Sequence, residues 1–170
     1  MSRRKVYDQE LFAHFVTFSC FRSRRLLDHD QPKRIVLGVL GDQLRHQTAT
    51  CVGFVLMPDH VHAIVWFPQT GQLSRFMHGW KRRSSHEVRK WPERINFRYL
   101  QETTFGDPVW QRKYYSFEIY SDEKLQEKLQ YIPLNPVPAG LVEKTVDWKW
   151  SSAGWYEQGK SVGVPLGWVE

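Results

Sequence analysis

The sequence predicts an α+β sandwich in which one antiparallel sheet carries helices packed mainly on one of its faces. Three observations support this fold class. Short runs rich in aromatic and β-branched residues alternate with longer stretches whose apolar residues recur at helical spacing. Two of the short runs are separated only by Pro58-Asp59, a turn that makes them antiparallel neighbours. The resulting order of strand, helix, two strands, helix, late strand and helix is typical of a ferredoxin-like or RRM-like sandwich.

The first half of the chain contains a strand, a helix and a hairpin. Residues 14–21 are rich in aromatic and β-branched side chains and predict the first strand. Pro32 begins a helical pattern that continues to about residue 47, and proline suits a first turn because its missing N–H has no partner there. Residues 50–57 predict the next strand, which turns back into a strand over residues 60–67.

A second long helix, a late strand and a third helix follow. Residues 72–91 carry apolar residues at helical spacing, with basic residues crowding the other positions. Residues 92–109 contain several turn-forming residues and are expected to be an irregular connection. Residues 110–120 predict a strand, and Ser121 is expected to cap a helix that ends near Tyr131.

The length of 170 residues is that of one domain, so residues 1–170 are expected to form a single unit. Within it we expect residues 1–13 to form a basic arm and residues 143–170 to form a C-terminal extension that packs on the domain. The only cysteines, Cys20 and Cys51, lie in apolar runs, which argues against a disulfide framework and a cysteine metal site. No segment has the length of a membrane span and no signal core follows the basic N-terminus, so the expected location is the cytoplasm, without membrane contact.

A net charge of +6 favours a polyanionic partner such as nucleic acid, although many ordinary basic proteins share this charge. Residues 81–83 place three like charges in one helical turn, where they repel one another unless an anionic group relieves them. This arrangement favours contact with a DNA backbone. For the arginines at 22, 24 and 25, a solvated turn explains the sequence equally well. For Arg112 and Lys113, a position flanking the sheet edge does so. The candidate DNA contacts are Arg22, Arg24 and Arg25, then Lys81, Arg82 and Arg83, and finally Arg112 and Lys113.

The clearest chemical signal is a pair of histidines on the strand over residues 60–67. Successive side chains of a strand point to opposite faces, so His60 and His62 share one face and the other face is wholly apolar. Two neighbouring imidazoles can hold a divalent ion. A His-x-His pair alone is more often explained by ordinary hydrogen bonds, and Ile64 stands where a histidine-triad hydrolase would need a third histidine. A metal site would therefore need further ligands from elsewhere in the chain.

Four motifs in one order together resemble the single-tyrosine HUH transposases, in which two histidines flank a bulky apolar residue. The resemblance is strongest to the REP-associated tyrosine transposases and their relatives. It extends over most of the chain and is far more specific than the histidine pair alone. The motifs are residues 55–62 (VLMPDHVH), residues 110–115 (WQRKYY), residues 131–137 (YIPLNPV) followed by residues 140–142 (GLV), and residues 147–152 (DWKWSS).

The resemblance implies the ferredoxin-like fold, an activity and a role for four residues. His60 and His62 are implied metal ligands, and Asn135 is implied to complete the metal site with its amide. Tyr131 is the implied nucleophile, although a tyrosine hydroxyl is a weak nucleophile at neutral pH without help. The implied cofactor is Mg²⁺ or Mn²⁺, which suits imidazoles, an amide oxygen and water. The implied reaction is cleavage of single-stranded or hairpin DNA through a 5′-phosphotyrosine, followed by strand transfer.

Two positions differ from the pattern of the relatives and leave alternatives open. Ser116-Phe117 stands where relatives often have an acidic residue followed by histidine. Pro133 stands where they usually have another residue, and proline argues against helical spacing between Tyr131 and Asn135. The alternatives are a nucleic-acid-binding module that has lost catalysis and a metal phosphodiesterase that uses water. The sequence also leaves open a homodimer, in which Tyr131 serves either its own metal site or that of the other copy.

Overall fold

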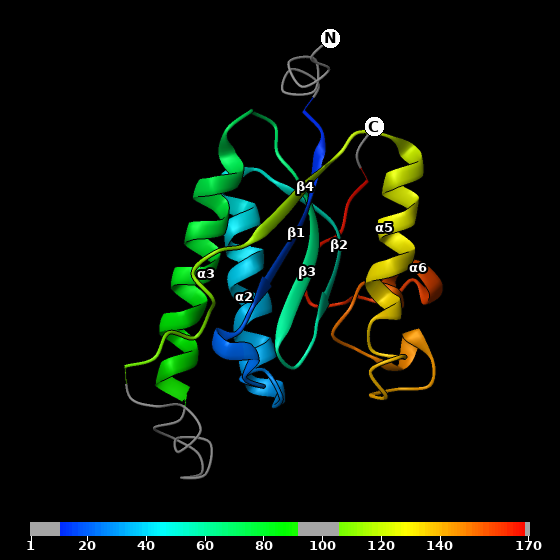
Figure 1. Ribbon diagram of the computed structural model, residues 1–170. Coiled ribbons are helices and arrows are strands. Elements are labelled where there is room, and N and C mark those ends of the chain that lie inside the picture. Colours follow the sequence, from blue (N-terminus) through cyan, green and yellow to red (C-terminus); the bar gives the residue numbers. More distant parts are fainter. Residues whose placement is uncertain (1–10, 92–105, 169–170) are drawn as a thin grey trace.

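The computed structural model describes residues 11–91 and 106–168, which fold into three layers (Figure 1). A four-stranded sheet forms the middle layer, with two long helices on one face and a third helix on the other. None of the helices in the described ranges has the length and apolar character needed to cross a bilayer. In chain order the elements are β1 (Ala13–Ser19), η1 (Phe21–Ser23), α2 (Asp30–Gln47), β2 (Thr50–Leu56), β3 (His60–Trp66), α3 (Gln72–Lys90), β4 (Tyr115–Ile119), α5 (Asp122–Leu134), η3 (Thr145–Asp147) and α6 (Ala153–Gln158).

The sheet has the strand order β2-β3-β1-β4, and all neighbouring strands are antiparallel. Together with the intervening helices this is the arrangement of a ferredoxin-like sandwich, so the predicted fold class is confirmed. His62 lies opposite Thr17 on β1 and opposite Val55 on β2. Thr17 in turn lies opposite Tyr115 on β4. One row of side chains therefore crosses all four strands through His62.

The main core fills the space between the sheet and helices α2 and α3. Val61, Ala63 and Val65 of β3 belong to it, as alternation along the strand predicts. Trp80 of α3 is completely buried in the same core, and its indole Nε1 donates to the carbonyl of Val36 on α2 at 2.9 Å. This hydrogen bond joins the two helices to each other behind the sheet.

A smaller apolar cluster lies on the opposite face of the sheet, which helix α5 covers (Figure 1). Ile64 of β3 is fully buried there, together with Leu125 and Ile132 of α5. Because side chains alternate along β3, His60 and His62 lie on the same face as Ile64. The fold thus places the histidine pair beside α5, with α2 and α3 on the other side of the sheet.

Two strand boundaries differ from the sequence prediction by more than one residue. β1 ends before Arg22, whose left-handed φ of 53° lies inside the short turn η1. β4 begins only at Tyr115, and Trp110, which is buried in the main core, makes an isolated bridge to Cys20. Residues 1–10 of the expected basic arm and residues 92–105 of the expected connection lie outside the described part of the chain.

The C-terminal segment covers the outer edge of β2. The backbone N–H of Leu56 donates to the carbonyl of Trp150 at 2.8 Å. The N–H of Ser152 donates to the carbonyl of Phe54 at 2.9 Å, and the Ser152 hydroxyl accepts from the N–H of Phe54 at 3.1 Å. β2 is the last strand of the sheet, but its outward backbone groups have partners in this segment.

Candidate active site

β3 presents His60 and His62 on the face that α5 covers. Their ring centroids lie 4.8 Å apart with the ring planes at 76°, so both imidazoles border the same small space. His62 is buried, whereas 25% of the His60 side chain is exposed. The histidine pair therefore opens to solvent on the His60 side.

A hydrogen bond to Nδ1 orients each ring. Nδ1 of His60 lies 2.7 Å from a carboxylate oxygen of Asp59, to which it donates. Nδ1 of His62 lies 2.7 Å from the hydroxyl of Thr17, its neighbour on β1. With Nδ1 used in this way, Nε2 of each ring is the nitrogen that can bind a metal ion.

The environment of His62 favours its neutral form. The pKa of His62 is lowered to about 4, mainly because burial disfavours the charged ring. Positive charge on His60 and Lys128 also lowers this pKa, whereas the amide of Asn135 acts in the opposite direction. His62 is therefore neutral at neutral pH and keeps a lone pair for a metal ion.

We expect the stability of the metal-free protein to depend on pH through His62. Its folded-state pKa of about 4 lies below the ordinary value of 6.5, so between these pH values the unfolded chain binds a proton that the folded chain does not. Its contribution to the free energy of unfolding is complete above pH 6.5, and about 3 kcal/mol is lost as the pH falls to 4. Urea unfolding in the presence of a chelator measures this loss against the variant His62→Gln. Parallel pH profiles for the two proteins would contradict the prediction.

Helix α5 places Tyr131 and Asn135 on the same side. Ser121 caps its start as predicted, accepting a backbone N–H at 3.2 Å. The predicted end near Tyr131 is wrong, because the helix continues through Pro133 to Leu134 and Asn135 still has helical angles (φ −49°, ψ −43°). Proline is tolerated in this last turn because its missing N–H costs only one hydrogen bond. The helical spacing of four residues from Tyr131 to Asn135 is therefore kept.

The end of the helix orients the side-chain amide of Asn135. Its Nδ2 donates to the carbonyl of Tyr131 at 2.9 Å and to the carbonyl of Ile132 at 3.1 Å. With the nitrogen held in this way, Oδ1 is the atom that can accept a hydrogen bond from His62 or bind a cation. Asn135 favours the charged form of His62, so the amide and the imidazole interact across the site.

The residues present fit a Mg²⁺ or Mn²⁺ ion. Two imidazole nitrogens and one amide oxygen are available, and water completes the ligand shell of such ions in proteins. The described ranges contain no group of three or more His, Cys, Asp or Glu side chains that could hold a metal. Asn135 is therefore the side chain that can supply a third protein ligand, since Asp59 is already bonded to His60.

Tyr131 extends from α5 beside the histidine pair. Its ring lies edge-on to His62 at a centroid distance of 5.5 Å and edge-on to Phe15 at 6.2 Å. Phe15 in turn stacks on His62 at 5.4 Å, which fixes the position of both rings. The Tyr131 side chain is 46% exposed, so a substrate as large as a nucleic acid strand can reach it. The structure thus brings together all four residues that the sequence singled out for catalysis and metal binding.

The first group of predicted DNA contacts consists of Arg22, Arg24 and Arg25, which come shortly after β1 in the chain. Arg24 forms an ion pair with Asp107 at 2.8 Å, and Arg25 forms one with Asp28 at 2.8 Å. Arg22 is exposed and takes part in none of the ion pairs found in the described ranges. Arg22 is therefore the member of this group whose charge is most available to a partner.

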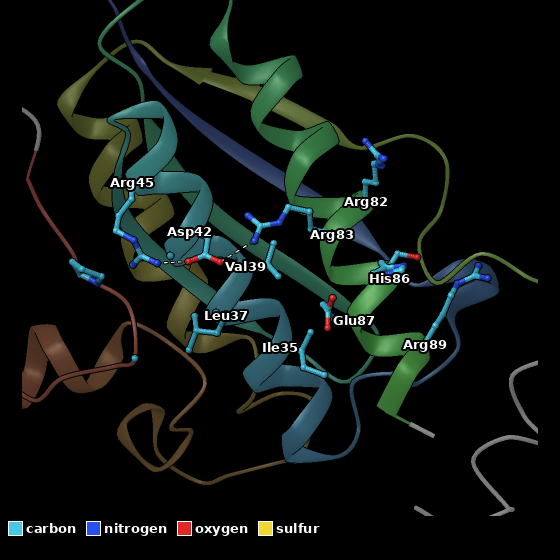
Figure 2. A pocket seen from close by; sticks show the side chains of 15 residues that line it. Ile35, Leu37, Val39, Asp42, Arg45, Arg82, Arg83, His86, Glu87 and Arg89 are labelled. Atoms are coloured by element: carbon cyan, nitrogen blue, oxygen red, sulfur yellow. Dashed lines mark hydrogen bonds and ion pairs between the residues drawn. The ribbon is translucent and has the colours of Figure 1, made fainter. Parts of the chain in front are cut away.

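The second group lies on α3, on the far side of the sheet from α5 (Figure 1), the helix that carries Tyr131. Lys81 donates to two backbone carbonyls, at 2.7 and 3.0 Å. Arg83 binds Asp42 of α2 at 3.0 Å, and Arg82 is exposed at a groove between the two helices (Figure 2). The protein itself thus provides partners for Lys81 and Arg83, whereas Arg82 is exposed. These three residues are not brought together with the catalytic candidates.

The third group and the unusual Ser116-Phe117 pair lie around the start of β4. Arg112 and Lys113 are exposed just before this strand. Ser116 is exposed, whereas Phe117 is half-buried and packs with the apolar cluster under α5. Phe117 therefore contributes a ring to the face that carries the candidate site.

Three further residues shape the site and had no role in the sequence prediction. Thr17 lies on a different strand and 45 positions from His62, so no local pattern could have connected them. Asp59 directly precedes His60, so the sequence could have predicted a carboxylate partner for this histidine. Lys128 stands three positions before Tyr131 on α5, and its ammonium lies 5.5 Å from the tyrosine ring centroid.

Comparison with known sequences identifies relatives of this chain. Residues 8–135 match the family described as "Transposase IS200 like". A curated relative from Haemophilus influenzae, named "Putative REP-associated tyrosine transposase", is 28% identical over 108 residues, which are 63% of this chain. The chain spans 60% of the length of that relative.

Comparison with solved structures supports the same fold. A REP-associated tyrosine transposase bound to a REP hairpin matches with a TM-score of 0.69 at 18% identity, over 94% of this chain and 86% of that one. A "putative transposase" from Deinococcus radiodurans R1 matches with a TM-score of 0.51 at 19% identity, over 71% of this chain and 87% of that one. The resemblance read from the sequence is confirmed, because the family match over residues 8–135 covers most of the chain and includes both histidines and Tyr131. This chain therefore belongs to the IS200-like transposase family.

Proposed function

We propose that this protein is a metal-dependent transposase that cleaves single-stranded DNA at hairpin-bearing repeats and rejoins it. The observation that carries the proposal is the convergence of four side chains on one site. Family membership supports it, as do a relative named as a REP-associated tyrosine transposase and a structural neighbour bound to a REP hairpin. The four residues are His60 and His62 from β3 and Tyr131 and Asn135 from α5.

The proposed reaction begins with attack of the Tyr131 oxygen on a phosphodiester. A bond forms between this oxygen and phosphorus, the bond from phosphorus to the 3′ oxygen breaks, and the 3′ oxygen takes up a proton and leaves as a hydroxyl. The tyrosine proton passes to solvent, to which the half-exposed side chain is open. The resulting 5′-phosphotyrosine is still a phosphodiester. A 3′ hydroxyl of another DNA strand can therefore reverse the step and complete strand transfer.

The residues around Tyr131 position the substrate and the rings. A bound Mg²⁺ or Mn²⁺, held by Nε2 of His60, Nε2 of His62 and Oδ1 of Asn135, would neutralise and orient the scissile phosphate. The hydrogen bonds to Nδ1 of the two histidines keep Nε2 directed into the site. Phe15 excludes water from one side of His62 by stacking on its ring.

The proposal predicts a covalent protein–DNA adduct that requires a divalent ion. Labelled single-stranded hairpin DNA is incubated with the protein in Mg²⁺, in Mn²⁺ or in chelator, and the products are separated on a denaturing gel. We expect a band in which protein and label migrate together, in the presence of Mg²⁺ or Mn²⁺ only. Intact DNA after long incubation, at protein concentrations that bind it fully, would refute the proposal.

Two other outcomes of this experiment correspond to the alternatives. Cleavage without an adduct would indicate a phosphodiesterase in which water replaces Tyr131 as nucleophile. Tight binding without cleavage would indicate a binding module that has lost catalysis. The convergence of Tyr131 with the histidine pair favours the transposase, because neither alternative needs a half-exposed tyrosine at this position.

A further inference from the structure

The ammonium group of Lys128 lies over three aromatic rings beside the candidate nucleophile. Its Nζ is 4.7 Å from the ring centroid of Phe15, 5.5 Å from that of Tyr131 and 5.8 Å from that of Phe117. A cation over a ring face is attracted by the negative face of the aromatic system. The three rings therefore hold the lysine charge next to Tyr131.

Two lysines of α5, Lys124 and Lys128, differ in the groups that surround their ammonium. Lys124, one turn earlier, forms an ion pair with Glu127 at 3.0 Å on the outer side of the helix. Lys128 forms none of the ion pairs found within residues 11–91 and 106–168, and it is half-buried. Lys128 is thus a cation beside the nucleophile that has no ion-pair partner in the described part of the chain, and the carboxylate of its neighbour Glu127 is bonded to Lys124.

The register of the sheet places this charge towards β4 and the metal ligands on β3, with β1 between the two strands. Phe15 and Phe117 lie opposite each other on β1 and β4, so Lys128 sits towards β4. His62 lies on β3, on the other side of β1. A phosphate at the Tyr131 hydroxyl would therefore lie between Lys128 on one side and the histidine pair on the other.

We propose that Lys128 is a phosphate-binding residue of this site, whose ammonium contacts a non-bridging oxygen of the phosphodiester that Tyr131 attacks. The inference rests on the proposed function, since it names a contact to the same substrate. Lysine suits this role because its long stem has several rotatable bonds and its ammonium acts as a compact charge. The same contact stabilises the phosphotyrosine after cleavage, because the non-bridging oxygens keep their charge. The chain itself undergoes no further bond change in this contact.

The proposal also explains the residue at position 117. Phe117 packs under α5, and the ammonium of Lys128 lies 5.8 Å from its ring centroid. A histidine in this place would be a second titratable, polar group beside the lysine. The phenylalanine ring instead provides an apolar face that holds the lysine charge in position.

A neutral phosphate analogue tests the contact directly. A methylphosphonate, which lacks the charged oxygen, is placed in turn at each linkage of the single strand that flanks a DNA hairpin. Binding of each DNA in chelator is compared between wild type, Lys128→Met, Lys128→Arg and the control Lys124→Met. For wild type we expect one linkage at which the methylphosphonate weakens binding several-fold, and this linkage is the one cleaved in Mn²⁺. For Lys128→Met the loss at that linkage disappears, whereas Lys128→Arg and Lys124→Met behave as wild type.

The rate of adduct formation provides a second readout. At saturating unmodified DNA in Mn²⁺, Lys128→Met should form the adduct about ten- to a hundredfold more slowly, because a charge-assisted hydrogen bond is lost. Lys124→Met should keep the wild-type rate. An unchanged rate in Lys128→Met, or a methylphosphonate effect that persists in this variant, would overturn the proposal. If wild type forms no adduct at all, the proposed function fails, and the binding comparison still decides whether Lys128 contacts a phosphate.

Discussion

Replacement of Tyr131 by phenylalanine is expected to abolish the covalent protein–DNA adduct while the protein still folds and binds hairpin DNA. The change removes only the hydroxyl oxygen, and the ring contacts with His62 at 5.5 Å and Phe15 at 6.2 Å remain. The side chain is 46% exposed, so no buried hydrogen bond is lost. Because the nucleophile itself is removed, we expect the rate of adduct formation to fall by at least about a thousandfold. Single-turnover incubation in Mn²⁺, followed by a denaturing gel, measures this rate.

The control for this variant is Tyr115→Phe. Tyr115 is 59% exposed and lies on β4 opposite Thr17, in the same row of the sheet as His62. It is thus a second accessible tyrosine near the site, and its replacement should leave the adduct unchanged. An adduct that persists in Tyr131→Phe and is lost in Tyr115→Phe would assign the nucleophile to β4. Cleavage without an adduct in Tyr131→Phe would assign the attack to water.

Replacement of Trp80 by alanine is expected to be the most destabilising single change in the core. Trp80 is fully buried, lies edge-on to Phe18 at 4.7 Å and to Phe76 at 5.9 Å, and donates to the carbonyl of Val36. Alanine would leave a cavity between α3 and the sheet and would remove a buried hydrogen bond between α3 and α2. We expect the free energy of unfolding to fall by about 3–5 kcal/mol. For a chain of this length the unfolding temperature should fall by about 10 °C.

Urea and thermal unfolding of Trp80→Ala should be compared with Trp155→Ala. Trp155 on α6 is 42% exposed, so its loss should change the free energy of unfolding by no more than about 0.5 kcal/mol. The comparison separates the effect of losing a buried indole ring from the effect of losing an exposed one. Equal effects in the two variants would show that the space between α2, α3 and the sheet is not the main source of stability.

The long periodic elements could be predicted closely from the sequence. The observed bounds of α3, Gln72–Lys90, differ by one residue from the prediction, because buried residues such as Phe76 and Trp80 repeat at helical spacing along its length. The sheet order could not be derived from local pattern, since β1 pairs with β3 and with β4, both far away in the sequence. Such pairings depend on packing between distant segments, on which local periodicity carries no information.

In the candidate site, too, local features could be predicted from the sequence and contacts between distant residues could not. The strand period correctly placed His60 and His62 on one face, because alternation is a local property. The expected break at Pro133 was wrong, because proline near the end of a helix removes one hydrogen bond and leaves the helical angles intact. The amide of Asn135 also satisfies carbonyls at this helix end, which the sequence pattern did not reveal.

The basic cluster on α3 shows that a charge pattern alone does not reveal which partners the charges have within the fold. Arg83 pairs with Asp42 of α2, and Lys81 donates to backbone carbonyls before β4. Asp42 lies on α2 and the carbonyls lie just before β4, so the local pattern around residues 81–83 contained no sign of these contacts. Electrostatic relief of this kind becomes visible only when the helices are packed against each other.

The coverage of β2 by the C-terminal segment has a consequence for how the protein behaves in concentrated solution. An uncovered strand edge presents unpaired backbone groups to other molecules and promotes their addition as further strands. β2 has seven residues and is almost entirely buried, so its bare edge would combine open hydrogen-bonding groups with apolar side chains. Leu56 and Ser152 contribute to the backbone contacts that close this edge. Removal of the segment would thus turn an internal boundary of the fold into a template for aggregation.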